Sequence, residues 1–466
     1  MRYEDAVKIL SENDQSHLLK FWDRLDETQR QSLLGQIADL DFTALAEMRK
    51  ALAAHLTPKT AKTLGEITPA PVAVLEGEAA DAAARIGSFE IRNRRVAALV
   101  VAGGQGSRLG YEGPKGCFPI GPISQESLFF FHARKILALG REWGAAIPFY
   151  VMTSTENDAP TRAFFKENNY FGLDKDDVFF FTQAMWPALD ADGRIILDRP
   201  DRIFLGPDGH GGTFAALERS GGLADMVKRG ITSVFYFQVD NPLVDVADPV
   251  FVGFHKQRNA DISLKVCAKR NADEGLGVVV ERDGKVEIVE YTEFPPAQKS
   301  ERLPDGDLRF KYGSVAIHVF DLDFLRREAQ SGLPIHVAFK KVPFVDDDGD
   351  TVKPEAPNAY KFEKFIFDSL ADAKISVCLA FDRADEFAPV KNATGNDSPA
   401  TCQAALMAKW ARWLRTCGVN VAVDENGVPA VKVEIDPAFA HSAAALRKRL
   451  TAENITIDPT KDILLQ

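Results

Sequence analysis

The sequence predicts an α/β fold with a mixed, mostly parallel sheet, an N-terminal helical region and a small C-terminal domain. From residue 96 onward, short β-branched and aromatic runs alternate with longer helical segments, the pattern of a sheet covered by helices on both faces. Residues 1 to about 55 carry apolar side chains at helical spacing. After Trp413 the sequence changes to short strand-like runs and one basic helix.

The first 95 residues are expected to form a helical region followed by a linker. The apolar positions that define the helices are Leu18, Leu19, Trp22, Leu25, Leu33, Leu34, Ile37 and Leu40. In residues 57–87, Pro58, Pro69 and Pro71 prevent a continuous helix through the first half. We expect this stretch to wrap the surface of the core.

The core is predicted to span residues 96–410. Its first strand-like runs are VAALVVA at 96, IPFYVMT at 147, VFFF at 178, ITSVFYFQV at 231 and ISLKVCA at 262. Later runs at 275–291 and 312–320 are typical of antiparallel strands, with Asp283-Gly284 as a two-residue turn in the first of them. These additions make the predicted sheet mixed.

Residues 411–466 are predicted to form the small C-terminal domain. A strand pair is expected within residues 419–435, on either side of a turn at Glu425-Asn426-Gly427. A basic helix is expected near residues 443–450.

Composition limits the classes of function. The chain has 67 acidic and 56 basic residues, a formal net charge of −11, so we expect neither nucleic acid nor an anionic membrane as a partner. The N-terminal residues MRYEDAVKIL do not resemble a signal peptide, and the apolar run at 96–102 is too short to span a membrane. The five cysteines include no C-x-x-C pair. These features predict a cytoplasmic protein with reduced cysteines.

The strongest local signal is the glycine-rich loop LVVAGGQGSRLGYEGPKG at residues 99–116. Its glycines let a backbone approach phosphate closely and direct N–H groups at it. Arg108 and Lys115 would neutralise phosphate charge from within the loop. The segment is therefore predicted to bind a polyphosphate. The glycines are Gly103, Gly104, Gly106 and Gly110.

Two commoner phosphate loops fit this segment less well. A Walker loop needs Gly-Lys followed by Ser or Thr, whereas proline precedes Lys115 and glycine follows it. The dinucleotide fingerprint is G-x-G-x-x-G, whereas Gly104, Gly106 and Gly110 are spaced G-x-G-x-x-x-G. A glycine-rich turn without a ligand would leave Arg108 and Lys115 unexplained.

The loop G-G-x-G-[ST]-R-L-G followed by P-K resembles the signature of the UDP-N-acetylhexosamine and UDP-glucose pyrophosphorylases. Further blocks of the same family follow in order: FFTQAMWPALD, FLGPDGHGGTFAAL, FQVDNPLV, VGFH, LGVVVERDGKVEIVEYTEF, LPIHVAFKKVPFVD, KFEKFIFDSL and DEFAPVKNA. The likeness covers about residues 96–410 and is greatest to the UDP-N-acetylglucosamine branch. It implies a Rossmann-like nucleotidyltransferase core that converts UTP and a sugar 1-phosphate, N-acetylglucosamine 1-phosphate as first choice, into UDP-sugar and pyrophosphate.

This reaction needs charge neutralisation and alignment rather than a general base, because a sugar phosphate is already largely deprotonated at neutral pH. The resemblance implies that Asp240, at the end of a parallel strand, binds Mg²⁺. One firm carboxylate is sufficient, since Mg²⁺ completes its shell with water and phosphate oxygens. By the same resemblance, Arg108 and Lys115 hold the leaving pyrophosphate. Lys391 contacts the transferred phosphate, and Lys361 is a weaker second candidate.

The resemblance also implies substrate-binding residues. Gln183 would accept the uracil N3–H, and backbone groups of Gly103, Gly104 and Gly209 would serve the rest of the nucleotide. The sugar would lie near Gly277, Glu290, Ser314 and His210.

Two positions depart from the branch. His210 stands in P-D-G-H-G-G, where the UDP-N-acetylglucosamine branch has Asn and the UDP-glucose branch has His. Gly313-Ser314 stands where both usually have Asn. Glucose 1-phosphate and galactose 1-phosphate are therefore alternative substrates.

Two functions from other classes are weighed against this one. A non-catalytic sugar-nucleotide sensor would keep the pocket but could lose the cations and the metal ligand. Arg108, Lys115, Asp240 and Lys391 are all present, which favours an enzyme. A nicotinamide-dependent dehydrogenase is disfavoured by the spacing of the loop glycines.

Overall fold

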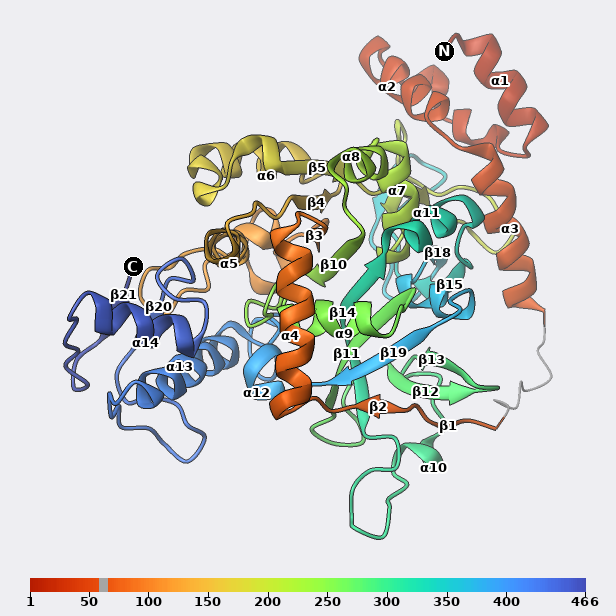
Figure 1. Ribbon diagram of the computed structural model, residues 1–466. Coiled ribbons are helices and arrows are strands. Elements are labelled where there is room, and N and C mark those ends of the chain that lie inside the picture. Colours follow the sequence, from red (N-terminus) through yellow and green to blue (C-terminus); the bar gives the residue numbers. More distant parts are fainter. Residues whose placement is uncertain (58–65) are drawn as a thin grey trace. The chain divides into compact units, whose positions relative to one another are not determined.

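The computed structural model describes residues 1–57 and 66–466, and the chain divides into two compact units (Figure 1). Unit 1 comprises Met1–Gly65, Gln183–Gly212 and Gly332–Asp368. Unit 2 comprises Glu66–Thr182, Thr213–Ser331 and Ser369–Gln466. Both units combine segments that are far apart in sequence. The domains expected at 1–95, 96–410 and 411–466 stay a prediction, because a compact unit need not be an independently folding domain.

Unit 1 contains the predicted N-terminal helices: α1 (Tyr3–Glu12), α2 (Glu27–Ala38) and α3 (Phe42–Leu56). Asp26 begins α2 with a capping box, since its carboxylate accepts the Gln29 N–H while the Gln29 side chain accepts the Asp26 N–H. The apolar faces of the helices pack with Leu189 and Phe362 in a separate core. The prediction of amphipathic helices is confirmed for Leu33, Leu34 and Ile37 of α2. The earlier positions Leu18, Leu19 and Trp22 lie instead in two short 3-10 helices, Ser16–Leu19 and Trp22–Arg24.

Antiparallel strand pairs form the rest of unit 1. The pairs are β6 (Met185–Pro187) with β9 (Leu205–Pro207), β7 (Leu197–Arg199) with β8 (Arg202–Ile203), β15 (His336–Lys340) with β18 (Ala359–Glu363), and β16 (Phe344–Val345) with β17 (Thr351–Val352).

Unit 2 is built around a large sheet whose strands run in the order β2-β19-β11-β14-β10-β3-β4-β5 (Figure 1). Their bounds are Val72–Ala73, Ser376–Ala380, Ile262–Ala268, Tyr312–Asp321, Ser233–Gln238, Val96–Val101, Phe149–Thr153 and Val178–Thr182. Only β14 runs antiparallel to its neighbours along this path, and every other pair is parallel. The predicted mixed, mostly parallel sheet is confirmed.

The predicted hairpin is also confirmed: β12 (Val278–Arg282) pairs antiparallel with β13 (Lys285–Val289). Asp283 and Gly284 both have positive φ, 50° and 74°, as a two-residue hairpin turn of type I′ requires. The linker adds strands to the sheet as well as covering it, because β1 (Thr68–Pro69) pairs with β12 and β2 pairs with β19. Pro58 and the other residues of 58–65 lie outside the described residues.

Alternation along β10 distributes side chains to the two faces of the sheet. Phe235 and Phe237 join one core cluster with Phe251 of α9 (Pro249–Gln257). Tyr236, between them, packs instead against the Phe320 ring at a centroid distance of 6.0 Å. Both faces of β10 are therefore buried, as in a sheet covered on both sides.

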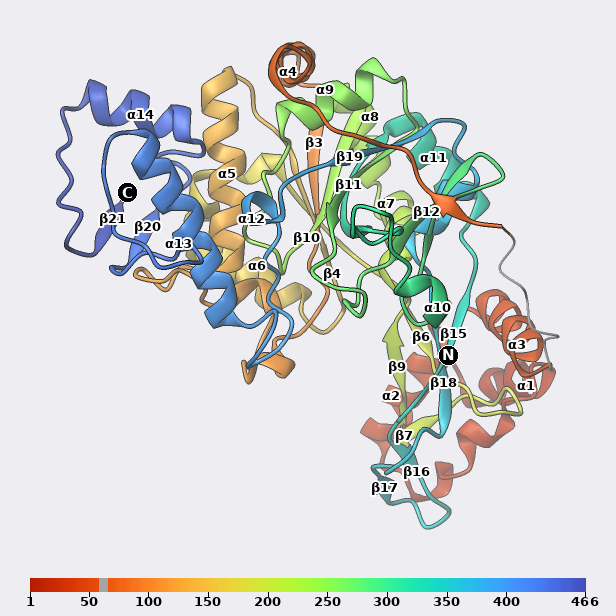
Figure 2. The ribbon, with the colours of Figure 1, turned by 90° about the horizontal axis from the view of Figure 1, so that it is seen from below.

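Helices cover the sheet and the linker. Their bounds are α4 (Gly77–Arg92), α5 (Leu128–Trp143), α6 (Asp158–Glu167), α7 (Thr213–Arg219), α8 (Gly222–Arg229), α10 (Pro296–Lys299), α11 (Leu322–Ser331) and α12 (Arg383–Glu386). Helix α4 packs closely on α9 (Figure 2). A Cβ at Gly87 would lie only 1.9 Å from the Pro249 carbonyl oxygen, so this contact requires glycine.

The C-terminal part of unit 2 contains α13 (Pro399–Thr416), β20 (Val433–Ile435), the predicted basic helix α14 (Ala443–Ala452) and β21 (Ile463–Leu465). The strand pair expected within 419–435 is wrong. Around the expected turn only Val423 and Pro429 form a bridge, and β20 pairs in parallel with β21. Helix α14 supplies the crossover that a parallel pair needs. Among the described residues, no helix is long and apolar enough to cross a membrane.

Candidate active site

The glycine-rich loop follows β3 and is closed by backbone hydrogen bonds. The Gly106 N–H donates to the Gly113 oxygen (2.9 Å), and the Lys115 N–H donates to the Gly104 oxygen (3.0 Å). Gly113 has φ = 139°, a conformation that other residues rarely adopt. Because its ends are tied to each other, the loop can present Lys115 in a fixed place.

Asn157 anchors this loop to the rest of unit 2. Its buried amide donates to the Ala102 oxygen (2.9 Å) and the Gly104 oxygen (3.2 Å). Sequence reasoning did not select Asn157, because a single Asn before a helix carries no distinctive spacing. Gly103 is half-buried, whereas Gly104 and Arg108 are exposed. The exposed part of the loop is accessible to a ligand.

Lys115 and Asp240 form an ion pair, with a distance of 3.1 Å between Nζ and Oδ2. Asp240 lies just beyond β10, which is paired with β3 up to Gln238 and Val101. The two adjacent parallel strands therefore end side by side and bring the loop lysine to the carboxylate. The side chains are 18% and 12% exposed, which leaves both within reach of a ligand.

Lys391 lies next to a backbone contact with Asp240. The Val390 N–H donates to the Asp240 oxygen (2.8 Å), and the Lys391 N–H donates to the Asp397 oxygen (2.7 Å). The Lys391 ammonium lies 6.0 Å from the centroid of the Phe387 ring. The structure thus brings together the segments that carry Lys115, Asp240 and Lys391 at one end of the sheet.

Three residues assigned to the sugar also lie together in unit 2. The Ser314 N–H donates to the Gly277 oxygen (2.9 Å). A Cβ at Gly277 would lie 2.5 Å from Cγ2 of Ile288 and 3.8 Å from Oε1 of Glu290. Gly277, Glu290 and Ser314 therefore form one corner where β12, β13 and β14 meet.

Two residues assigned to the nucleotide belong to unit 1. Gln183 is buried, and its neighbour Ala184 accepts the Asp208 N–H (3.1 Å), which joins it to the loop containing Gly209. Gly209 has φ = 82°, and a Cβ there would lie 2.5 Å from the Lys364 oxygen. The backbone of this loop therefore requires glycine.

His210 packs inside unit 1 in an aromatic cluster. Its ring stacks on Phe365 at a centroid distance of 5.6 Å, and its Nδ1 accepts the Ile366 N–H (3.2 Å). Burial lowers the pKa of His210 to about 4. The imidazole is therefore neutral at physiological pH, with its proton on Nε2 because Nδ1 is an acceptor.

Lys361 also lies in unit 1, on β18 opposite Ala338 of β15. Its ammonium lies 4.7 Å from the centroid of the Phe204 ring, and burial lowers its pKa. Within this unit, packing on Phe204 accounts for its position.

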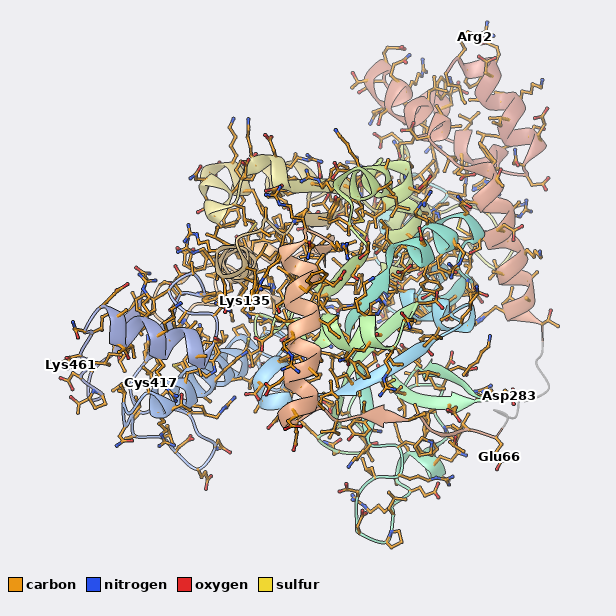
Figure 3. All side chains as sticks on the ribbon, in the orientation of Figure 1. Arg2, Glu66, Lys135, Asp283, Cys417 and Lys461 are labelled. Atoms are coloured by element: carbon orange, nitrogen blue, oxygen red, sulfur yellow. The ribbon has the colours of Figure 1, made fainter. Side chains whose placement is uncertain are left out.

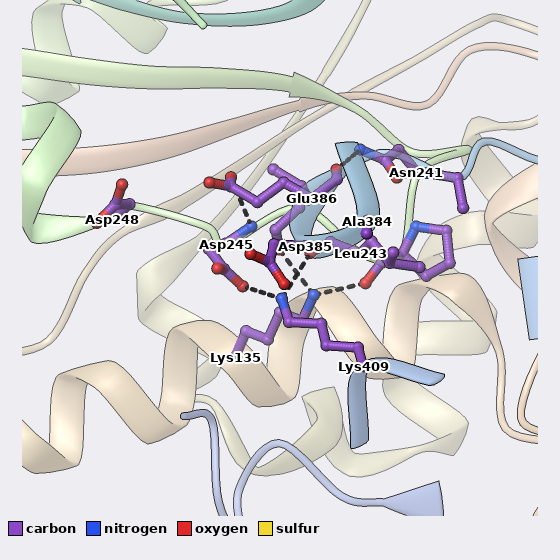
Figure 4. Close-up of polar contacts among 12 residues, drawn as sticks. Lys135, Asn241, Leu243, Asp245, Asp248, Ala384, Asp385, Glu386 and Lys409 are labelled. Carbon is purple, nitrogen blue, oxygen red and sulfur yellow. Dashed lines mark hydrogen bonds and ion pairs between the residues drawn. The ribbon is translucent and has the colours of Figure 1, made fainter. Parts of the chain in front are cut away.

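Sequence reasoning missed a group of buried and half-buried polar side chains next to the segment that carries Asp240. His132, Lys135 and Lys409 contact the backbone that follows β10. Figure 4 shows Lys135 and Lys409. The sequence did contain a signal. Lys135 is four residues from both Phe131 and Leu139, so it lies on the apolar face of its predicted helix, where a lysine needs a specific partner.

Asp240 is the residue with which unit 2 could hold a divalent cation. The described residues contain no group of three or more His, Cys, Asp or Glu side chains arranged as a metal site. A single carboxylate is too few for the closed sites typical of Zn²⁺. It fits Mg²⁺, which is often bound through one or two carboxylates together with water and substrate phosphates.

Comparisons with known proteins identify the family of the chain. The family model described as UTP–glucose-1-phosphate uridylyltransferase matches residues 61–455. The human UDP-N-acetylhexosamine pyrophosphorylase-like protein 1 is 37% identical, covering 95% of this chain and 94% of its own length. The UDP-N-acetylglucosamine pyrophosphorylase of Saccharomyces cerevisiae is 33% identical, covering 91% and 93%.

Solved structures give the same result. The Trypanosoma brucei uridine diphosphate N-acetylglucosamine pyrophosphorylase, solved with an inhibitor, is 29% identical with a TM-score of 0.84, covering 99% of this chain and 98% of its own. The Leishmania major UDP-glucose pyrophosphorylase shares the fold at 17% identity, with a TM-score of 0.61 and coverage of 92% and 88%. The chain therefore belongs to the UTP–glucose-1-phosphate uridylyltransferase family of nucleotidyltransferases, in its eukaryotic UDP-N-acetylglucosamine pyrophosphorylase branch.

Proposed function

We propose that this chain transfers the uridylyl group of UTP to N-acetylglucosamine 1-phosphate and releases pyrophosphate, with Mg²⁺ bound by Asp240. The observation that carries the proposal is the ion pair between Lys115 of the glycine-rich loop and Asp240 at the end of β10. It supports the proposal because phosphate binding needs a cation and Mg²⁺ needs a carboxylate, and Lys115 and Asp240 supply such groups at adjacent strand ends. Open α/β sheets bind their ligands at this position.

In the proposed reaction, a phosphate oxygen of the sugar 1-phosphate attacks the α-phosphorus of UTP. As the new P–O bond forms, the bond from the α-phosphorus to the bridging oxygen breaks, and its electron pair leaves with pyrophosphate. Because the attacking oxygen is already deprotonated, the step needs no general base. The chain has to align the two phosphates and offset their charge.

Lys115 changes its partner in this mechanism. Before substrate binds, its ammonium pairs with Asp240. UTP offers it phosphate oxygens, and Arg108, which is exposed on the same loop, adds a second positive charge to the pyrophosphate that leaves. Lys391 offsets charge on the transferred phosphate. Bound Mg²⁺ would supply further charge neutralisation at the phosphate oxygens.

The identity of the sugar 1-phosphate is the more specific part of the proposal. Relatives named for N-acetylglucosamine and N-acetylhexosamine favour N-acetylglucosamine 1-phosphate. His210 favours glucose 1-phosphate or galactose 1-phosphate as the alternative, because the histidine at this position resembles the UDP-glucose branch. We further propose a cytoplasmic location, because the five cysteines are all free thiols, as is typical of proteins in reducing compartments.

The test is pyrophosphate release by the purified chain with UTP, Mg²⁺ and each of N-acetylglucosamine, glucose and galactose 1-phosphates. Mass spectrometry of the UDP-sugar identifies the product. We expect the highest kcat/KM with N-acetylglucosamine 1-phosphate and loss of turnover with EDTA. Absence of turnover with every sugar phosphate would contradict the activity, whereas preference for glucose 1-phosphate would contradict only the sugar.

A further inference from the structure

The segment 239–244 carries Asp240 and forms neither helix nor strand, yet each of its carbonyl groups accepts a hydrogen bond. Backbone N–H groups serve two of these carbonyls: Val390 donates to Asp240, and Val244 donates to Asn241. The other four depend on side chains. Such a buried segment would otherwise lose the hydrogen bonds that water gives it.

Helix α5 supplies side-chain donors to three of these carbonyls. His132 Nε2 donates to the Val239 oxygen at 3.0 Å. One turn later, Lys135 donates to both the Pro242 oxygen (2.5 Å) and the Val244 oxygen (2.7 Å). The spacing of i and i+3 places His132 and Lys135 on the same face of the helix.

Helix α13 supplies the remaining donor. Lys409 donates to the Leu243 oxygen at 3.3 Å and pairs with a carboxylate oxygen of Asp245 at 2.7 Å. Figure 4 shows Lys135 and Lys409 converging on this segment, and Figure 3 labels Lys135 among the side chains of unit 2. Two helices thus hold consecutive carbonyls of the one segment.

Acidic side chains around the segment offset the buried positive charge. Asp245 pairs with Lys409, and its N–H donates to Glu386 (3.3 Å). Lys265, which is 1% exposed, pairs with both Asp248 and Glu386. Apart from the Lys115–Asp240 pair, these charged groups around the segment are three lysines and three carboxylates: Lys135, Lys265, Lys409, Asp245, Asp248 and Glu386.

Keeping Lys135 charged costs the folded protein free energy, because its ammonium is largely removed from water. Burial, together with the nearby charge of Lys409, lowers the pKa of Lys135 to about 7. An apolar side chain of similar length would fill the space at a lower cost. Its hydrogen bonds to Pro242 and Val244 are what an apolar replacement could not supply.

We propose that His132, Lys135 and Lys409 are positioning residues that fix the segment bearing Asp240, so that this carboxylate keeps its place when Lys115 moves to the substrate phosphate. The proposal rests on the proposed function for the role of Asp240. None of the three needs to contact the substrate. Their effect reaches the reaction through the backbone of residues 239–244.

The test compares Lys135→Met and Lys409→Met with controls on the same helices. Arg134→Met removes the neighbouring side chain on α5, which pairs with Asp436 (2.9 Å). Arg415→Met removes a side chain of α13 that donates to the Val421 oxygen (3.2 Å). Each control deletes a cation with a buried or half-buried partner, but neither partner lies in the segment 239–244.

The first readout is binding of Mn²⁺, as a probe for Mg²⁺, to each protein with UTP, measured by electron paramagnetic resonance. We expect Lys135→Met to weaken binding by about tenfold, typical of changes behind a metal ligand. Hydrogen exchange should become faster in 239–245, and Arg134→Met should change neither quantity. Lys135→Gln, which keeps a neutral donor, should lie between Lys135→Met and wild type.

The second readout separates positioning from stability. Below the melting temperature of every variant, Lys135→Met and Lys409→Met should raise the Mg²⁺ concentration needed for half-maximal turnover and lower kcat, with KM for the sugar phosphate unchanged. The positioning role is wrong if Mn²⁺ affinity falls as much in the Arg134→Met control as in Lys135→Met. It is also wrong if Mn²⁺ affinity falls in neither Lys135→Met nor Lys409→Met. If the wild-type chain releases no pyrophosphate while the Mn²⁺ measurements give the expected differences, only the proposed function is contradicted. Should Lys135→Met fail to fold, Lys409→Met and Lys135→Gln carry the test alone.

Discussion

Lys115 and Asp240 are 125 residues apart in sequence, yet their charged atoms lie 3.1 Å apart at the ends of two adjacent parallel strands. Each neutralises the other while no substrate is bound, which reduces the cost of keeping both charges half-buried. UTP and Mg²⁺ would give each a new partner of opposite charge. In the proposed mechanism the pair would therefore link phosphate binding to metal binding, because neither could be completed while the pair is intact.

Replacing Asp240 should separate its role in the reaction from its role in the fold. We expect Asp240→Asn to lower kcat by more than about a hundredfold, roughly 3 kcal/mol of transition-state stabilisation, because the amide cannot replace a charged metal ligand. Asp225→Asn, which removes a carboxylate paired with Arg229 elsewhere in unit 2, is the control and should retain turnover. Pyrophosphate release and circular dichroism measure the two effects. A near-normal rate at ordinary Mg²⁺ concentrations would remove Asp240 from the metal site.

The two lysines should affect different kinetic constants. Lys115→Ala should raise KM for UTP and for pyrophosphate, since its charge is directed at the leaving group. Lys391→Ala should mainly lower kcat, because charge on the transferred phosphate changes only as the reaction proceeds. Steady-state kinetics in both directions distinguish them. Wild-type constants in both variants would contradict the account of charge neutralisation.

The sheet of unit 2 was largely predictable because its strands are continuous apolar runs with turn residues between them, as at 96, 233 and 262. The strand with which β20 pairs was not predictable from the sequence. The local sequence of Val433–Ile435 predicts a strand but not its partner, which could be the preceding run or Ile463–Leu465. The helix between β20 and β21 allows the parallel pairing that is observed. Pairing between short strands depends on contacts that are remote in sequence.

For the site, motif and resemblance predicted Lys115, Asp240 and Lys391, since each is carried by a distinctive block, and the structure brings their segments together. The residues that contact the segment of Asp240 were missed. Lys135 lies among apolar helix positions, but this signal does not say what its partner is. The partners of Lys135 and Lys409 are backbone carbonyls of Pro242, Leu243 and Val244. A carbonyl has no signature in the sequence, so only the folded chain identifies such contacts.

Glu328 of α11 should make the stability of unit 2 depend on pH. Its side chain is buried, and burial, together with the nearby charge of Asp372, raises its pKa to about 7, although Arg327 opposes this. Between pH 4.5 and 7 the folded state therefore binds more protons than the unfolded state, and stability falls as pH rises.

Glu328→Gln removes this titration. The variant should melt roughly 1–3 °C higher than wild type at pH 8, with little difference at pH 5, because the protonated carboxyl and the amide are both neutral. Thermal melts at the two pH values provide the measurement. An equal shift at both pH values would mean that packing, not the carboxylate charge, is responsible.

His210 should decide the preference between sugars, if position 210 contacts the sugar. Its neutral ring is held by the Ile366 N–H and by stacking on Phe365, so the bulky side chain has little freedom to make room for an N-acetyl group. Asparagine is smaller and retains a carbonyl acceptor, and we therefore expect His210→Asn to raise kcat/KM for N-acetylglucosamine 1-phosphate relative to glucose 1-phosphate. A buried polar mismatch can discriminate between substrates strongly. His336→Asn is the control, since His336 packs on the same Phe365 ring, with centroids 4.5 Å apart. An equal shift in both variants would assign the effect to the aromatic cluster, and an unchanged ratio in His210→Asn would mean that this position does not determine the sugar.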